Sequence, residues 1–186
     1  MHIPLACSIG ALLFTWLGIL SLFEMAYMQS FGLILIAVWL DMLDGYLARK
    51  WKQTSQYGAN VDLLHDVLNY LLYPCILFYW FGFNSPLAIA ILFLFLLAGI
   101  TRLARFHEQG FTESKGMLHY QGMPVYLNHV IVLVVLGLGM RNHLFLMIML
   151  PIASLLMVST IPFPKPKNAL LWSVILLSGA IVFLLL

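Results

Sequence analysis

The chain has 186 residues, of which 63% are hydrophobic and 9% charged, whereas about a quarter of the residues in ordinary soluble domains are charged. This composition excludes a soluble globular protein and predicts an all-α integral membrane protein. The formal net charge is only +2, and no basic patch with interleaved aromatic residues is present, so we expect membrane lipids and no nucleic acid as partners.

Apolar segments follow one another along the chain. A spanning helix needs about 20 apolar residues, and segments that meet this need begin near residues 3, 31, 61, 87, 123, 144 and 169. We predict a bundle of six to seven transmembrane helices, with residues 169–186 as the additional C-terminal helix. Residues 1–186 are expected to form a single transmembrane domain without a soluble domain.

Lysine and arginine are distributed unequally between the two sides that alternating spans define. Arg141 lies alone on one side. The other side carries Arg49, Lys50, Lys52, Arg102, Arg105, Lys115, Lys165 and Lys167. By the positive-inside rule the second side is cytoplasmic. We therefore expect a multi-pass protein of the cytoplasmic (inner) membrane, with the aspartates described next facing the cytoplasm.

Four aspartates fall within residues 41–66, although the chain has only seven acidic residues. A carboxylate at the bilayer centre costs roughly 2.5 to 3.5 kcal/mol on insertion scales. Asp41 and Asp44 are three residues apart, and Asp62 and Asp66 are four apart, so each pair shares one helix face. Carboxylates held close together repel one another, and a hard divalent cation such as Mg²⁺ or Mn²⁺ removes that repulsion. The pattern therefore predicts a metal site.

Small residues accompany the aspartates on both helices. Gly45 and Ala48 follow the first pair, and Gly58 lies four residues before Asp62, which leaves room for a ligand against the backbone. Phosphoryl transfer assisted by two cations is the chemistry that this arrangement favours. His65, beside Asp66 in sequence, points about 100° away from it on a helix and is expected to support a ligand indirectly or to pack.

The aspartates also fit two roles that involve no enzymatic reaction. In the first role they are helix ends near the headgroups, with salt bridges to Arg49, Lys50 or Arg102. In the second role they form the permeation site of a cation transporter. The sequence contains no internal repeat of the kind that builds transporters from two related halves, which favours the enzyme over the transporter.

The string from Asp41 to Asp66 matches D-x2-D-G-x2-A-R-x8-G-x3-D-x3-D at every specified position and resembles the signature of the CDP-alcohol phosphotransferase family of membrane enzymes. The resemblance implies a homodimeric bundle of transmembrane helices. It implies that Asp41, Asp44 and Asp62 hold two divalent cations, and that Asp66 contributes to the second and is the catalytic base. The CDP part of the donor is then expected to lie among Asp41, Gly45, Ala48, Arg49, Gly58 and Asp62.

Further segments resemble the smaller bacterial and archaeal phosphatidylserine synthases of this family: residues 102–106, 122–124, 156–159 and 163–164. This resemblance implies transfer of a phosphatidyl group from CDP-diacylglycerol to L-serine, with release of CMP. Leu63 and the pair Tyr70-Leu71 depart from the pattern of those enzymes, so glycerol 3-phosphate, an inositol phosphate and choline stay as alternative acceptors. The residues predicted to bind the acceptor or the lipid phosphate are Arg102, Arg105 and Asn69. The alternative for the two arginines is that they only reach toward the headgroups.

Two connections between the spans have distinctive compositions. Residues 107–122 form the longest predicted loop, on the cytoplasmic side, where it could cover a site. Pro162, Pro164 and Pro166 alternate before the last predicted helix and favour an extended backbone there.

Overall fold

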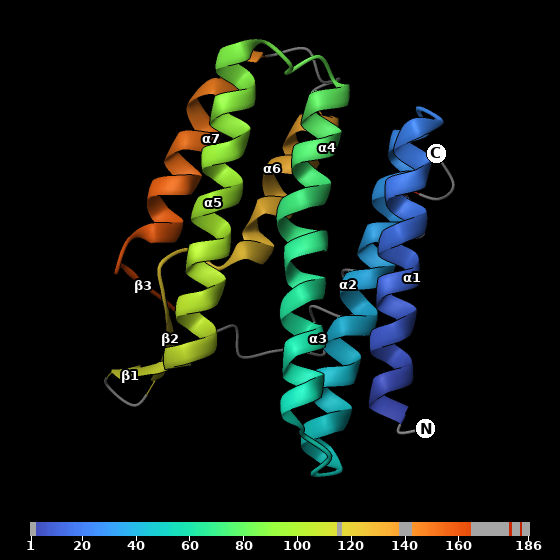
Figure 1. Ribbon diagram of the computed structural model, residues 1–186, viewed down its shortest axis with the longest axis vertical. Helices are drawn as coiled ribbons and strands as arrows, with labels where there is room; N and C mark the ends of the chain where they lie inside the picture. Colours follow the sequence, from blue (N-terminus) through green and yellow to red (C-terminus); the bar gives the residue numbers. More distant parts are fainter. Residues whose placement is uncertain (1–2, 115–116, 138–142, 165–178, 180–182, 184–186) are drawn as a thin grey trace. The chain divides into compact units, whose positions relative to one another are not determined.

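The computed structural model describes residues 3–114, 117–137, 143–164, 179 and 183, and most of them are helical (Figure 1). Four helical stretches are long and apolar enough to cross a membrane, at residues 6–23, 27–50, 56–80 and 86–109. Two shorter apolar helices cover residues 125–137 and 143–158. The prediction of an all-α, multi-pass membrane protein is confirmed. The predicted helix at residues 169–186 lies outside the described residues apart from Gly179 and Phe183, and the number of spans stays a prediction.

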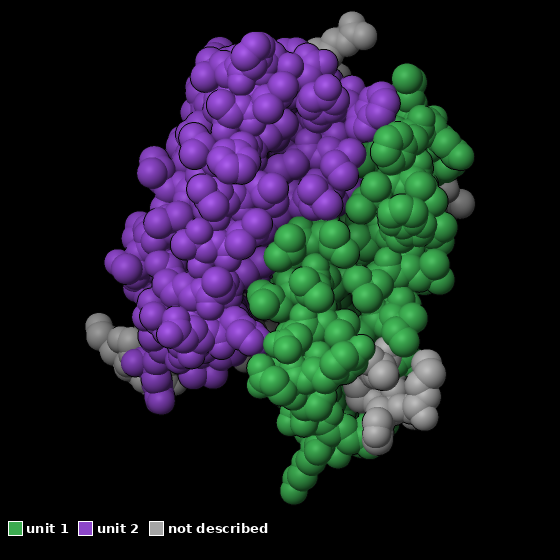
Figure 2. All heavy atoms as spheres, viewed as in Figure 1, with its two compact units in different colours: residues 1–69, 168–186 green, residues 70–167 purple. Residues whose placement is uncertain are grey.

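The chain folds into two compact units, residues 1–69 with 168–186 and residues 70–167 (Figure 2). The helices of the first unit are α1 (Ile3–Phe23), α2 (Tyr27–Lys50) and α3 (Gln56–Asp66). Those of the second unit are α4 (Tyr73–Trp80), α5 (Pro86–Gln109), η2 (Val125–Leu127), α6 (Asn128–Gly137) and α7 (His143–Val158). A π-helical segment, η1 (Val67–Leu72), connects α3 to α4. The single domain expected for residues 1–186 stays a prediction.

In the first unit, α1 packs against α2 at short range. Gly18 on α1 permits this approach, because a Cβ added there would lie only 3.0 Å from the Ile34 side chain of α2. The Ser30 hydroxyl of α2 donates a hydrogen bond of 2.6 Å to the carbonyl oxygen of Gly18. Membrane helices associate through close packing and interhelical hydrogen bonds, which small residues allow.

The turn after α2 reverses the chain within a few residues. Lys52 has a φ of +55°, and its N–H bonds to the carbonyl of Arg49, while the N–H of Gln53 bonds to the carbonyl of Ala48. These two bonds form a Schellman motif, which ends helices by satisfying their last carbonyl groups. The carboxyl end of α2 and the amino end of α3 are therefore joined by a short connection.

Ser55 begins α3 as its N-cap, and its hydroxyl oxygen accepts a 3.0 Å hydrogen bond from the N–H of Gly58. The helix starts at Gln56, and α2 starts at Tyr27, several residues before the apolar segments that predicted them near residues 61 and 31. The first turns of both helices are polar or interfacial in sequence, so hydropathy alone does not locate them.

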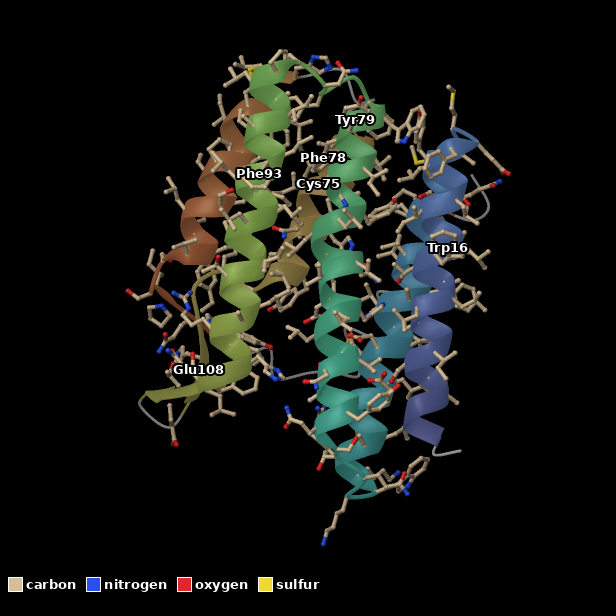
Figure 3. The ribbon with its side chains drawn as sticks, in the orientation of Figure 1. Trp16, Cys75, Phe78, Tyr79, Phe93 and Glu108 are labelled. Carbon is tan, nitrogen blue, oxygen red and sulfur yellow. The ribbon has the colours of Figure 1, made fainter. Side chains whose placement is uncertain are left out.

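The second unit is built on α5, which packs against α7, and on α4, which contacts both α5 and α6. Cys75 and Phe78 of α4 are buried, whereas Phe93 of α5 is 60% exposed (Figure 3). Trp16 of α1, in the other unit, is likewise 58% exposed (Figure 3). Large apolar side chains on helix exteriors fit contact with lipid tails, which gives them an apolar surrounding.

A small antiparallel sheet completes the second unit. Its strands, in the order in which they pair, are β1 (Thr112–Ser114), β2 (Met117–Gln121) and β3 (Pro162–Pro164). Tyr120 pairs with Phe163 in its register. The extended backbone predicted from the alternating prolines is confirmed at Pro162 and Pro164, and Pro166 lies outside the described residues. Among the described strands β3 is an edge strand, where proline is tolerated because one side of the backbone needs no partner. Residues 107–122, which were predicted to form a loop, contain β1 and β2, and this sheet was not predicted.

Candidate metal centre

The four aspartates of the motif fall into two groups of side chains. The ligand atoms of Asp41, Asp44 and Asp62 lie within 4.8 Å of one another, and so do those of Asp41, His65 and Asp66. Asp41 belongs to both groups. The carboxylates of α2 and α3 thus meet around two adjoining positions, as the spacing within each helix predicts for side chains that share a face.

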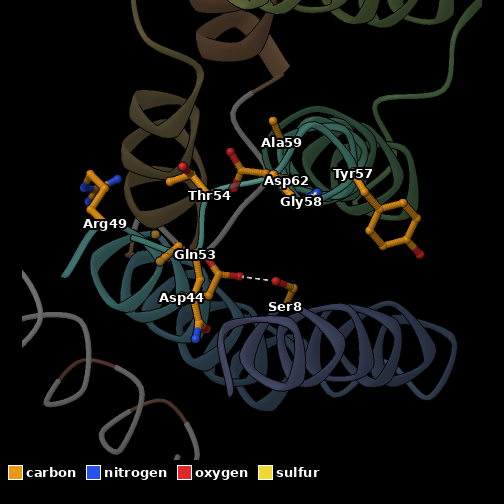
Figure 4. Close-up of a pocket in the computed structure, with 12 residues that line it drawn as sticks. Ser8, Asp44, Arg49, Gln53, Thr54, Tyr57, Gly58, Ala59 and Asp62 are labelled. Carbon is orange, nitrogen blue, oxygen red and sulfur yellow. Dashed lines mark hydrogen bonds between the residues drawn. The ribbon is translucent and has the colours of Figure 1, made fainter. Parts of the chain in front are cut away.

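A cavity of about 480 Å³ adjoins the first group. Asp44 from α2 and Asp62 from α3 line it, with Ser8 of α1 opposite Asp44 (Figure 4). The Ser8 hydroxyl donates a hydrogen bond of 2.5 Å to Oδ2 of Asp44. The complete lining is Ser8, Asp44, Gly45, Ala48, Arg49, Gln53, Thr54, Ser55, Tyr57, Gly58, Ala59 and Asp62.

Five of the six residues predicted to surround CDP line this cavity: Gly45, Ala48, Arg49, Gly58 and Asp62. The sixth, Asp41, is not among the lining residues that the structure describes. Two of these residues leave little room for a side chain. A Cβ added at Gly45 would lie 3.3 Å from Nη1 of Arg49, and one added at Gly58 would lie 3.3 Å from Oγ of Ser55. A larger side chain at either position would displace its neighbour or narrow the cavity.

The donor atoms suit a hard divalent cation. The first group offers carboxylate oxygen atoms alone, the ligands that Mg²⁺ and Mn²⁺ prefer, and it runs from the buried Asp44 to the exposed Asp62. A cation could therefore be reached from the cavity while one ligand is shielded from water. The acidic groups fit the metal centre that the spacing of the aspartates predicts.

Three buried polar side chains next to Asp41 form hydrogen bonds with one another: Thr15, His65 and Asn69. Nδ1 of His65 lies 2.9 Å from Oδ1 of Asp41, and Nε2 lies 3.1 Å from Oγ1 of Thr15. Asn69, predicted to bind the acceptor, is 0% exposed and its Nδ2 contacts Thr15 and His65, each at 3.3 Å. The predicted acceptor role of Asn69 stays a prediction.

Ser8 and Thr15 were not among the residues predicted from the sequence. A signal for both was available: they are polar residues seven positions apart in the apolar run of residues 3–23, and residues spaced by seven lie on one face of a helix. Hydroxyl groups alone, however, are common in membrane helices, where they often bond to their own backbone, as Ser21 does with the carbonyl of Leu17. The spacing becomes informative only when the carboxylates opposite it are known.

The two predicted acceptor arginines lie in the second unit, in different surroundings. The Arg102 side chain is buried, with its guanidinium carbon 5.0 Å from the ring centroid of Phe106 and 5.2 Å from that of Tyr120. Such contacts between a guanidinium and aromatic rings are attractive. This arginine is therefore packed inside the unit, and its predicted role in binding the acceptor or the lipid phosphate stays a prediction.

Arg105 connects the end of α7 to the sheet. Its guanidinium donates hydrogen bonds of 2.9 to 3.0 Å to the carbonyl oxygens of Gln121, Met157, Val158 and Ser159. The last carbonyls of a helix lack partners within the helix, and a cationic donor there also interacts favourably with the helix dipole. These bonds give Arg105 a structural task, and its predicted role in acceptor binding stays a prediction.

Comparisons with known proteins agree with the motif. The sequence model of the family described as CDP-alcohol phosphatidyltransferase matches residues 1–185. The chain is 34% identical over 154 residues to the CDP-diacylglycerol--serine O-phosphatidyltransferase of Methanocaldococcus jannaschii, covering 83% of this chain and 73% of that protein. It is 29% identical over 182 residues to the enzyme of the same name from Helicobacter pylori, covering 91% and 75%. It is also 31% identical over 136 residues to the archaetidylserine synthase of Methanothermobacter thermautotrophicus, covering 72% and 57%.

Proposed function

Because this chain belongs to the CDP-alcohol phosphatidyltransferase family, we propose that it transfers a phosphatidyl group from CDP-diacylglycerol to L-serine and releases CMP. The observation that carries the proposal is the pair of acidic groups that share Asp41, next to a cavity lined by the glycines of the motif. Serine as the acceptor is supported by the names of the relatives. Glycerol 3-phosphate, an inositol phosphate and choline are the acceptors to be tested against it.

Asp41, Asp44, Asp62 and Asp66 are the residues proposed to hold two divalent cations, Mg²⁺ or Mn²⁺. Bound cations would neutralise the pyrophosphate charge and polarise the reacting phosphorus–oxygen bonds. The oxygen donors of the aspartates and their mutual distances support this assignment. Without a cation, four neighbouring carboxylates in a membrane protein would be costly to keep ionised.

The cavity is the proposed place of the cytidine diphosphate. Its wall includes the amino-terminal turn of α3, with Ser55, Tyr57 and Gly58, and the partial positive charge of a helix amino terminus favours phosphate groups. Arg49, exposed at the same wall, carries a planar guanidinium that can donate two parallel hydrogen bonds to a phosphate. The small residues let the ligand approach the backbone of α2 and α3.

In the proposed reaction, Asp66 accepts the proton of the acceptor hydroxyl. The hydroxyl oxygen then forms a bond with the phosphorus that bears the diacylglycerol. The bond between this phosphorus and the bridging pyrophosphate oxygen breaks, and the oxygen leaves with CMP. The phosphatidyl group passes directly to the acceptor, and no nucleophilic side chain is required.

The distribution of lysine and arginine supports an orientation in which the site opens toward the cytoplasm. This orientation would let water-soluble serine reach the site and CMP leave it, while the acyl chains of CDP-diacylglycerol stay in the bilayer. We propose the cytoplasmic (inner) membrane as the location and a homodimer as the assembly, as is usual for the family that the motif resembles.

The purified protein in detergent micelles tests the proposal with CDP-diacylglycerol, Mg²⁺ or Mn²⁺, and one acceptor at a time. We expect CMP release that depends on serine and stops when EDTA removes the cation. Release with another acceptor would correct the substrate and leave the reaction type in place. If no acceptor leads to CMP release and Mn²⁺ enters liposomes that contain the protein, the proposed enzymatic function is wrong and cation transport is the function.

A further inference from the structure

His65 lies at the centre of a buried polar network that contacts the candidate metal centre through Asp41. Its side chain is 2% exposed, and both ring nitrogens are engaged: Nδ1 with Oδ1 of Asp41 at 2.9 Å, and Nε2 with Thr15 at 3.1 Å and with Asn69 at 3.3 Å. The four residues come from α1, α2, α3 and η1 and all belong to the first unit.

The donors and acceptors determine where the imidazole proton lies. An ionised Asp41 only accepts hydrogen bonds, so the nitrogen that faces it, Nδ1, must carry the proton. A neutral imidazole has a single N–H, which leaves Nε2 as an acceptor. Thr15 and Asn69 supply the donors that Nε2 then needs, through the hydroxyl and the amide nitrogen, and Asn69 also donates to Oγ1 of Thr15 at 3.3 Å.

Reversing the Asn69 amide would break this pattern. Its oxygen would then face Nε2 and require the proton there. In a neutral imidazole beside an ionised Asp41, Nδ1 would then turn a lone pair toward the carboxylate, and two acceptors would stand 2.9 Å apart. With the Asn69 amide oriented as in the structure, Thr15 and Asn69 therefore favour the tautomer in which His65 donates to Asp41.

Asp41 is the residue common to both groups of candidate ligands, so its orientation bears on both cation positions. A carboxylate on a helix can rotate about two side-chain bonds, and a hydrogen bond from a buried ring removes most of that freedom. A neutral donor does so without adding a positive charge beside the cations. Metal sites commonly orient their ligands through such outer partners.

We propose that His65 is a positioning residue that orients Asp41 for divalent-cation binding, with Thr15 and Asn69 holding its Nδ1-protonated tautomer. The inference rests on the proposed function, because it takes the aspartates as cation ligands. It differs from the plain alternative that His65 is itself a ligand, since both of its nitrogens already have partners within the network.

Mn²⁺ binding to the detergent-solubilised protein, measured by electron paramagnetic resonance of the free ion without nucleotide or acceptor, tests the proposal. For His65→Leu we expect Mn²⁺ affinity to fall by about 10-fold to 100-fold, the usual loss when an outer partner of a ligand is removed. Thr15→Val, which removes only the hydroxyl, is expected to weaken Mn²⁺ binding by a smaller factor. Thr15→Ser should restore the wild-type value.

Thr101→Val is the matched control, because Thr101 is an exposed helical threonine whose hydroxyl bonds to its own helix at the carbonyl of Leu97. It should bind Mn²⁺ as the wild type does. Nitrogen-15 spectra of labelled histidine provide a second measurement: one histidine should show a protonated Nδ1 and an acceptor Nε2, and this signal should disappear in His65→Leu and shift in Thr15→Val.

Unchanged Mn²⁺ affinity in folded His65→Leu, or in Thr15→Val should His65→Leu fail to fold, would overturn the positioning role. A wild type that binds no Mn²⁺ would overturn it as well. The proposed function fails separately: a wild type that binds Mn²⁺ in the network-dependent way but releases no CMP would retain the positioning role and lose the enzymatic reaction. CMP release by the wild type, combined with equal Mn²⁺ affinity in all variants, would retain the enzymatic reaction and rule out the positioning role.

Discussion

Ser8 and Asp44 are 36 residues apart in sequence, yet the hydroxyl of Ser8 donates a 2.5 Å hydrogen bond to Oδ2 of Asp44. The bond connects α1 to a carboxylate on α2 at the wall of the cavity (Figure 4). The first helix, which carries none of the motif, thus takes part in the candidate metal centre. Asp44 itself is buried, where a neutral donor helps to keep a carboxylate ionised and oriented.

Removing the hydroxyl in Ser8→Ala is expected to weaken cation binding by about 10-fold, the lower end of the range for outer partners of metal ligands. The reason is that Asp44 loses a donor which restricts its rotation. The measurement is the Mn²⁺ concentration that gives half-maximal CMP release. Ser21→Ala on the same helix, where the hydroxyl bonds only to the carbonyl of Leu17, should leave this concentration unchanged, and an equal shift in both variants would contradict the prediction.

Asp66 and Asp41 are expected to respond differently to loss of charge. Asp66→Asn should reduce CMP release by a factor of about 100 or more, the usual contribution of a general base, while CDP-diacylglycerol binding is largely retained. Asp41→Asn should weaken both Mn²⁺ and donor binding, because Asp41 belongs to both groups of candidate ligands. Titration of CDP-diacylglycerol into each variant, followed by CMP assays, separates the two effects. Wild-type turnover in Asp66→Asn would remove its role as base.

A buried amide on α6 donates a hydrogen bond to the backbone of η1. Nδ2 of Asn128 donates a 3.1 Å hydrogen bond to the carbonyl oxygen of Tyr70, and Pro74, four residues after Tyr70, has no N–H to donate to that carbonyl. Asn128→Leu withdraws this donor and is expected to destabilise the protein by about 1–3 kcal/mol. Thermal unfolding in detergent would measure the loss. Asn84→Leu, at an exposed position before α5, should change the unfolding temperature little.

Gly122 allows the sheet to approach the end of α7. Its φ is +76°, and an added Cβ would collide with the carbonyl oxygen of Met157 and lie 2.8 Å from Nη2 of Arg105. Gly122→Ala should therefore destabilise the protein by more than about 1 kcal/mol, the strain expected where the native conformation does not suit a side chain. Thermal unfolding would measure the loss.

Gly110 offers a control for this effect. It also has a positive φ, +67°, but an added Cβ there would meet nothing within 4 Å among the described residues. Gly110→Ala shows what a Cβ costs on a positive-φ backbone where it meets no other atom, and we expect a larger loss in Gly122→Ala because of the collision with the Met157 carbonyl oxygen. Equal losses in the two variants would show that the contacts around Arg105 tolerate the added atom.

Much of the candidate site could be predicted because it is local. The spacing of Asp41, Asp44, Asp62 and Asp66 specifies which side chains share a helix face, whatever surrounds the helices, and the small residues between them lie at fixed offsets. The composition alone predicts membrane helices. The same local rules account for the β3 prolines, since proline restricts its own backbone and that of the preceding residue.

What the sequence by itself determined is therefore the membrane fold class, the family motif and the faces that carry the carboxylates. Only the tertiary structure decided which residues from distant segments meet those faces: Ser8 beside Asp44, Thr15 and His65 behind Asp41, and Arg105 at the end of α7. Helical periodicity acts over one turn or two, whereas contacts between helices depend on how closely their backbones approach, as at Gly18 and Ile34. That approach is a property of the packed molecule, and no single segment contains it.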